Sequence, residues 1–187
     1  MSFSEVLTVL ALTHILAISA LVFGRTASGI VRLQEVKREA VHTNILALDM
    51  FAREWRIAGF SANGQPIEGV AAPSTDAVDL RADLDGDGAL SGFHERIAYQ
   101  WDANRGAVMR ATQSSSPQPW LQKVPPGGFV LTYLDPSGAP MPDPASEVRR
   151  ISGVRLQLRT EWAVELPPAS SLSAGFDASL SVARRNR

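Results

Sequence analysis

Uncharged, mostly apolar residues fill the start of the chain, and an amphipathic pattern follows them. From Val6 to Gly24 no side chain carries a formal charge. As a helix this run spans roughly 28 Å, close to the hydrocarbon thickness of a bilayer. No proline occurs before Pro66, so nothing obliges the helix to end at the membrane surface. The pattern predicts one long helix from about Ser2 to Ala58, which Gly59 terminates.

The second half of this helix is predicted to pack on the rest of the chain. Its apolar residues recur at spacings of four, three, four and three, which place them on one helical face. These residues are Val41, Ile45, Leu48, Ala52 and Trp55.

Residues 61–187 show the alternation and turn signals typical of antiparallel strands. The clearest case is Val154, Leu156, Leu158 and Thr160, which alternate with Arg155, Gln157, Arg159 and Glu161. One face of this strand is expected in the core and the other in water. The segment ELPPASSLSAG, residues 165–175, is predicted to be a loop before a closing strand.

These elements predict an α+β fold in which a long N-terminal helix packs on an antiparallel sheet. We divide the chain into residues 1–24, the transmembrane or filament-core half of the helix, residues 25–60, its amphipathic half, and residues 61–187, a β-rich globular head. Residues 61–187 suffice for one domain with a modest core.

The motif DLDGDG, residues 83–88, is the most specific local signal in the head. Its spacing matches the opening of a calcium loop, in which alternate carboxylates converge on the ion and a glycine allows a sharp turn. An EF-hand is not expected, because the twelfth position is His94 and ERIAYQW alternates like a strand. We predict a calcium-binding turn between two strands, with the ligands Asp83, Asp85, Asp87, Glu95 and the carbonyl of Ala89.

A solvated acidic turn without a metal remains open as the alternative. Three acids within five residues repel one another unless a cation or water intervenes. The sequence is compatible with both the calcium-bound turn and the solvated turn without a metal.

Composition excludes several classes of function. The chain has 18 basic and 19 acidic residues and a net charge of −1, so no global basic field attracts nucleic acid. It has no cysteine, which excludes disulfides, zinc–thiolate sites and cysteine nucleophiles. Of the three histidines, His14 lies in the apolar run and His42 on the long helix, so a catalytic triad would depend on His94. We therefore expect no enzyme.

The start of the chain resembles the type IV pilin family. The sequence MSFSEVL places Glu5 directly before the uncharged run, and an amphipathic helix then leads into a small domain. Met1 stands where this family most often has phenylalanine, and no basic leader precedes it in the sequence. The resemblance implies a processed chain, with an initiator methionine as the alternative for Met1. The resemblance implies a pilin fold in which Glu5 meets the N-terminal amine of a neighbouring subunit, and methylation of the processed N-terminus.

Scattered cues narrow the resemblance to minor pilins of the PilW type and type II secretion pseudopilins of the J type. They are WRIAGF, the DLDGDG turn, FVLTYLD, RRISGVRLQL and the ending ARRNR. This implies a structural subunit that helps initiate or cap a type IV pilus, or a subunit of the secretion pseudopilus tip. The implied partners are other minor pilins and the major pilin, contacted through the N-terminal helix, and the bacterial inner membrane.

Two other interpretations of the apolar helix stay open. A signal-peptide core is usually shorter and follows basic residues, whereas a single-span anchor would suit a periplasmic binding module with a helical stalk. The basic residues lie after the span, at Arg25, Arg32, Lys37 and Arg38, so the positive-inside rule would put the head in the cytoplasm. The pilin resemblance implies a periplasmic head.

Overall fold

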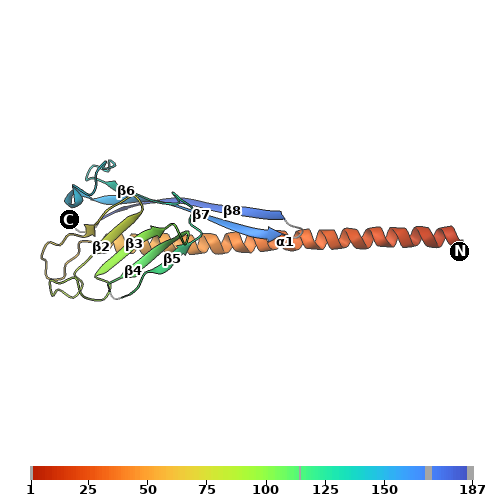
Figure 1. Ribbon diagram of the computed structural model, residues 1–187, viewed down its shortest axis with the longest axis horizontal. Coiled ribbons are helices and arrows are strands. Elements are labelled where there is room, and N and C mark those ends of the chain that lie inside the picture. Colours follow the sequence, from red (N-terminus) through yellow and green to blue (C-terminus); the bar gives the residue numbers. More distant parts are fainter. Residues whose placement is uncertain (1, 114, 167–169, 185–187) are drawn as a thin grey trace. The chain divides into compact units, whose positions relative to one another are not determined.

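The computed structural model describes residues 2–113, 115–166 and 170–184. Figure 1 shows a long helix followed by β-strands. The elements are α1 (Phe3–Ile57), β1 (Val70–Ala71), β2 (Ala77–Arg81), β3 (Arg96–Asp102), β4 (Ala107–Thr112), β5 (Gln118–Gln122), β6 (Phe129–Leu134), the 3₁₀ helix η1 (Val148–Arg150), β7 (Gly153–Leu166) and β8 (Ser170–Ala183).

Helix α1 ends where the sequence predicted. Gly59 has a φ of +84°, a left-handed conformation that glycine adopts without steric cost. Its N–H donates to the carbonyl of Arg81 at 2.8 Å, so the end of the helix is bonded to strand β2. Among the described residues, α1 is long and apolar enough to cross a membrane by length and composition, and its most apolar stretch is not buried in the protein.

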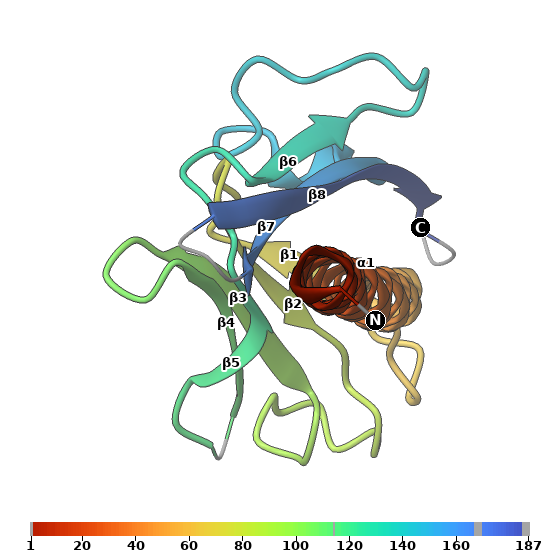
Figure 2. The ribbon, with the colours of Figure 1, turned by 90° about the vertical axis from the view of Figure 1, so that its right-hand side faces the viewer.

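The strands form two antiparallel sheets, drawn together in Figure 2. One has the order β1-β2-β3-β4-β5 and the other the order β6-β7-β8. In the first sheet Leu80 of β2 lies opposite Ile97 of β3, and Tyr99 of β3 lies opposite Arg110 of β4. In the second, Leu131 of β6 lies opposite Leu156 of β7. The predicted α+β class, with a long helix packed on antiparallel strands, is confirmed.

The chain forms two compact units. One contains α1 up to Glu39 together with Trp162–Ala174, and the other contains Ala40–Glu161 and the chain from Gly175 onward. We call the second of these the head unit. Its core joins the last turns of α1 to both sheets, around Phe51, Trp55, Tyr99 and Tyr133.

The buried face of α1 differs from the predicted face. Ala52 and Trp55 are buried as expected, but Val41 and Ile45 are 42% and 54% exposed. The buried positions form a stripe shifted by about one residue, namely Ala40, Asn44, Ala47, Phe51, Ala52, Trp55 and Ala58. The strands of the head unit pack on this stripe, in which Asn44 donates a 2.8 Å hydrogen bond to the Thr160 hydroxyl of β7. Spacing alone predicted an apolar face, but the position of the sheets determined which face is buried.

Strand β7 confirms the alternation predicted for it and extends beyond it. Val154, Leu156, Leu158 and Thr160 are buried, and their alternating neighbours are exposed. The predicted loop at residues 165–175 is wrong at both ends, because β7 continues to Leu166 and β8 begins at Ser170. Residues 167–169 of the predicted loop lie outside the described residues.

Candidate functional site

Glu5 caps the N-terminus of its own helix. The backbone N–H of Ser2 donates to Oε2 of Glu5 at 2.8 Å, and the N–H of Glu5 donates to the Ser2 hydroxyl at 3.4 Å. This reciprocal pair is a capping box, which satisfies two N–H groups that the helix leaves free. The signature of this arrangement, Ser-x-x-Glu, is present in the sequence at residues 2–5 but was not among the predicted features. Met1, whose N-terminal amine is the partner that the pilin resemblance implies for Glu5 of a neighbouring subunit, lies outside the described residues.

The acidic turn connects β2 to β3, and it brings three of the predicted ligands together. Carboxylate oxygens of Asp83, Asp85 and Asp87 lie within 4.8 Å of one another. Asp83 is buried, and the other two are exposed. Antiparallel strands flank the turn, which confirms the expectation that it is not an EF-hand.

Each aspartate in the turn also accepts a backbone hydrogen bond. The N–H of Gly86 donates to Asp83 at 2.7 Å, that of Asp87 to Asp85 at 3.0 Å, and that of Ala89 to Asp87 at 2.7 Å. Such bonds shape a turn with or without a metal. Calcium binding therefore stays a prediction, with the solvated acidic turn as its alternative.

Glu95, another predicted ligand, is buried against the backbone of the turn. Its carboxylate accepts hydrogen bonds from the N–H groups of Leu84 at 2.8 Å, Asp85 at 3.2 Å and Gly92 at 2.6 Å. Burial acts to raise the pKa of Glu95, but these backbone bonds outweigh it and lower the pKa. Glu95 thus stabilises the conformation of the turn through these hydrogen bonds. Its role as a metal ligand remains a prediction.

The residues after α1 hold the acidic turn against the end of the helix. Ser61 donates from its hydroxyl to Asp83 at 3.1 Å, and the Asn63 amide donates to the carbonyl of Gly86 at 2.9 Å. The backbone N–H of Asp83 donates to the carbonyl of Phe60 at 2.8 Å. The roles of Ser61 and Asn63 were not predicted, because the composition of a loop does not indicate which distant residues it contacts. A ligand bound at the acidic turn would therefore lie next to the C-terminal end of α1.

A second polar cluster links α1 to the five-stranded sheet. Arg110 donates from Nη2 to Oε1 of Glu54 at 2.6 Å, and the Tyr99 hydroxyl donates to Oε2 of Glu54. Burial, then the charge of Glu54, raises the pKa of Tyr99. Burial lowers the pKa of Arg110, but the hydrogen bond and charge of Glu54 outweigh this and raise it. The cluster is mostly buried, and its arrangement is that of a structural clamp.

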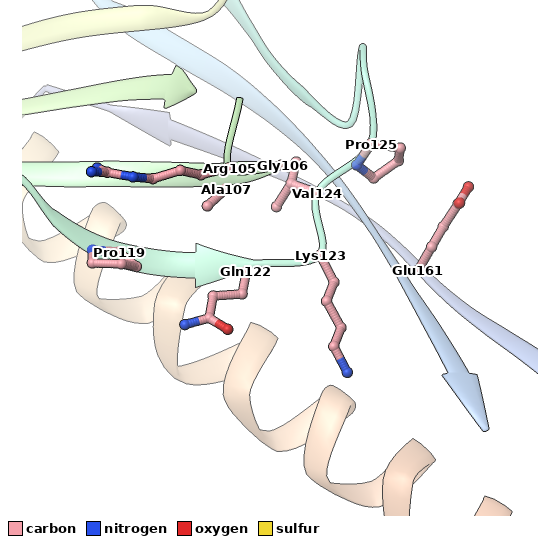
Figure 3. A pocket seen from close by; sticks show the side chains of 9 residues that line it. All are labelled: Arg105, Gly106, Ala107, Pro119, Gln122, Lys123, Val124, Pro125 and Glu161. Atoms are coloured by element: carbon pink, nitrogen blue, oxygen red, sulfur yellow. The ribbon is translucent and has the colours of Figure 1, made fainter. Parts of the chain in front are cut away.

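The head unit has a surface depression of about 560 Å³ beside the ends of β4 and β5. Its floor includes Ala107 and Val124, and its polar residues include Arg105, Lys123 and Glu161. Figure 3 shows the side chains of these three residues pointing in different directions. Because they do not converge on one point, these three side chains do not form a group of acid, base and nucleophile.

No protein-family model matches the chain, and no curated protein matches it. Among solved structures, the chain is similar to a type IV-like pilin from Thermus thermophilus, with 16% identity and a TM-score of 0.43. The match covers 79% of this chain and 98% of the pilin.

Proposed function

We propose that this chain is a membrane-anchored, pilin-like structural subunit. In this proposal it acts as a minor pilin that helps initiate or cap a type IV pilus together with other minor pilins. The observation that carries the proposal is the carboxylate of Glu5 directly before an uncharged run whose large apolar side chains are exposed on α1.

The exposed apolar run supports an anchor that later packs with other helices. Phe3, Leu16 and Phe23 are 83%, 69% and 75% exposed. Side chains of this kind are stable only when lipid or other apolar helices cover them. The first half of α1 would therefore sit in the inner membrane, with the head in the periplasm, and would pass into the core of a filament on assembly.

Glu5 supports assembly rather than anchoring alone. A carboxylate at the edge of the hydrocarbon is costly unless it is paired, and the capping box supplies only backbone hydrogen bonds. An N-terminal amine from a neighbouring subunit would supply the missing positive charge. A subunit at the pseudopilus tip of a type II secretion system would use the same contact. Whether the chain belongs to a pilus or to a pseudopilus is therefore decided by which of the two filaments is lost in the native host.

The test separates the charge of Glu5 from its capping role. Glu5→Ala removes both, Glu5→Gln keeps an oxygen acceptor but removes the charge, and Ser2→Ala removes the capping hydroxyl but keeps the carboxylate. Glu35→Ala, on the exposed part of the same helix, is the matched control. Filament number in the native host and cross-linking between subunits are the readouts, with membrane extraction as the check on insertion.

We expect both Glu5 variants to insert into the membrane but to lose most filaments and cross-links. Ser2→Ala and Glu35→Ala should assemble like the wild type. If both Glu5 variants assemble normally, Glu5 is only a helix cap and the chain is a membrane-anchored module with a helical stalk. If Glu5→Gln assembles but Glu5→Ala does not, a hydrogen-bond acceptor, and not a charge, is what assembly needs.

A further inference from the structure

Helix α1 carries a hollow of about 430 Å³ where its uncharged run ends. Its described lining is apolar at Leu21, small at Ala20, Gly24, Ser28 and the buried Gly29, and basic at Arg25 and Arg32. A side chain at Gly24 would meet no atom within 4 Å. The Ser28 hydroxyl donates back to the carbonyl of Gly24 at 2.8 Å and so stays close to the helix. Small residues thus leave open space between two arginines.

The two arginines are available to bind a ligand. Arg25 and Arg32 are seven residues apart, which places them on the same side of a helix. Both are exposed, and neither forms a salt bridge with any residue in the described part of the chain. Their guanidinium groups match the oxygens of a phosphate in geometry and charge.

The hollow also lies at the right depth for a lipid headgroup. If Val6 to Gly24 fills the hydrocarbon core, Arg25 lies at its boundary and Arg32 is roughly 10 Å further along the helix. Long basic side chains at such a position reach into the headgroup layer. Leu21 then faces the hydrocarbon, where the acyl chains of a lipid begin.

We propose that this hollow binds the headgroup phosphate of an anionic phospholipid from the surrounding membrane. Arg25 and Arg32 hold the phosphate, the space over Gly24 and Ser28 admits the headgroup, and Leu21 contacts the first acyl carbons. This inference depends on the membrane anchoring in the proposed function, but not on filament assembly. It also assigns a function to Arg25 and Arg32, which would lie on the periplasmic side of the span. The positive-inside rule does not expect basic residues on that side.

The test is native mass spectrometry of the full chain in neutral detergent micelles, titrated with phosphatidylglycerol or phosphatidylcholine. Arg25→Gln with Arg32→Gln removes the charges of the hollow. Lys37→Gln with Arg38→Gln is the matched control, because it removes the same charge elsewhere on the helix. Gly24→Leu fills the hollow without changing any charge. A parallel titration contains excess inorganic phosphate.

We expect the wild type to retain phosphatidylglycerol in preference to phosphatidylcholine. The Arg25/Arg32 pair of substitutions should weaken this binding about 25-fold, since each basic side chain near an anionic headgroup contributes about fivefold. Gly24→Leu should weaken it without loss of charge, and the Lys37/Arg38 control should bind like the wild type. Inorganic phosphate should not displace the lipid, because it lacks the acyl contact.

If the Arg25/Arg32 and Lys37/Arg38 substitutions weaken phosphatidylglycerol binding equally, the proposal is overturned. The lipid would then be held by a general electrostatic attraction to the basic helix and not by the hollow. Equal retention of both lipids, an unaffected Gly24→Leu variant, or displacement by inorganic phosphate would each overturn it as well. A chain that does not partition into lipid vesicles at all would contradict the membrane anchor itself. Partitioning without lipid preference would contradict only this inference.

Discussion

The Nη2 atom of Arg110 lies 2.6 Å from Oε1 of Glu54, which joins strand β4 to helix α1 between residues 56 positions apart. The side chains of Arg110 and Glu54 are 19% and 12% exposed, and Tyr99 is fully buried beside them. An ion pair in this setting has few water molecules to replace a missing partner. The ion pair therefore fixes the position of α1 relative to strand β4.

Removal of Glu54 is expected to destabilise the fold. Glu54→Ala leaves the Arg110 charge and the Tyr99 hydroxyl largely buried without their acceptor, and the free energy of unfolding should fall by about 2–4 kcal/mol. Asp49→Ala is the control, because it breaks an exposed Asp49–Arg53 pair of the same helix and should cost less than about 0.5 kcal/mol. Denaturant unfolding of the full chain in micelles, followed by tryptophan fluorescence, measures both. Equal losses would show that the clamp contributes no more than a surface pair.

The two tyrosines predict an alkaline limit to stability. Tyr99 and Tyr133 are the only tyrosines, and burial, with the nearby charges of Glu54 and Asp76, raises the pKa of both above 10.0. A raised pKa means that the folded state favours the neutral phenol. The stabilisation is complete below pH 10.0 and is lost as the pH rises above it.

A spectroscopic titration of the full chain checks this. Tyrosinate absorbance should not appear near pH 10.0 in the folded chain, and should rise only together with the fluorescence change that marks unfolding. Tyr133→Phe should leave one tyrosine that behaves in the same way. Ionisation near pH 10.0 with the fold intact would contradict the burial of these hydroxyls.

The acidic turn predicts different effects for its exposed and buried acids. Without calcium, Glu95→Ala should lower the melting temperature, because three backbone N–H groups lose their acceptor. Asp85→Ala should change it little, since that carboxylate is exposed and accepts one backbone bond from Asp87.

If the turn binds calcium, the ion should raise the melting temperature of the chelator-treated chain by mass action. Asp85→Ala should abolish that rise and the heat of binding in a calorimetric titration. A wild type that shows neither heat nor a shift has a solvated acidic turn. In that outcome the hydrogen bonds of Glu95, Ser61 and Asn63 and the backbone bonds to the aspartates account for the shape of the turn.

The face of α1 that packs on the head predicts a contrast between two apolar residues. Phe51 is 0% exposed and Ile45 is 54% exposed. Phe51→Ala should lower the free energy of unfolding by about 3–5 kcal/mol through lost burial and a cavity. Ile45→Ala should change it by less than about 0.5 kcal/mol. Denaturant unfolding of the full chain measures both, and similar losses would place Ile45 in the core.

Local patterns in the sequence were sufficient for the elements themselves. The uninterrupted, proline-free start predicted a helix that ends at Gly59, because helical hydrogen bonds join residues only four apart. Alternation at Val154, Leu156 and Leu158 predicted which face of β7 is buried, because successive side chains of a strand point to opposite faces. The DLDGDG spacing likewise predicted a turn between strands that brings three carboxylates together.

Only the tertiary structure decided which chemical groups meet. The sheets lie against Ala47 and Phe51 and not against Val41 and Ile45, and both faces looked apolar in the sequence. The register of β3 and β4 places Tyr99 opposite Arg110, and the packing of the helix brings Glu54 to both. No short-range rule predicts such contacts, because their partners are distant in sequence and are brought together only by the packing of helix and sheets.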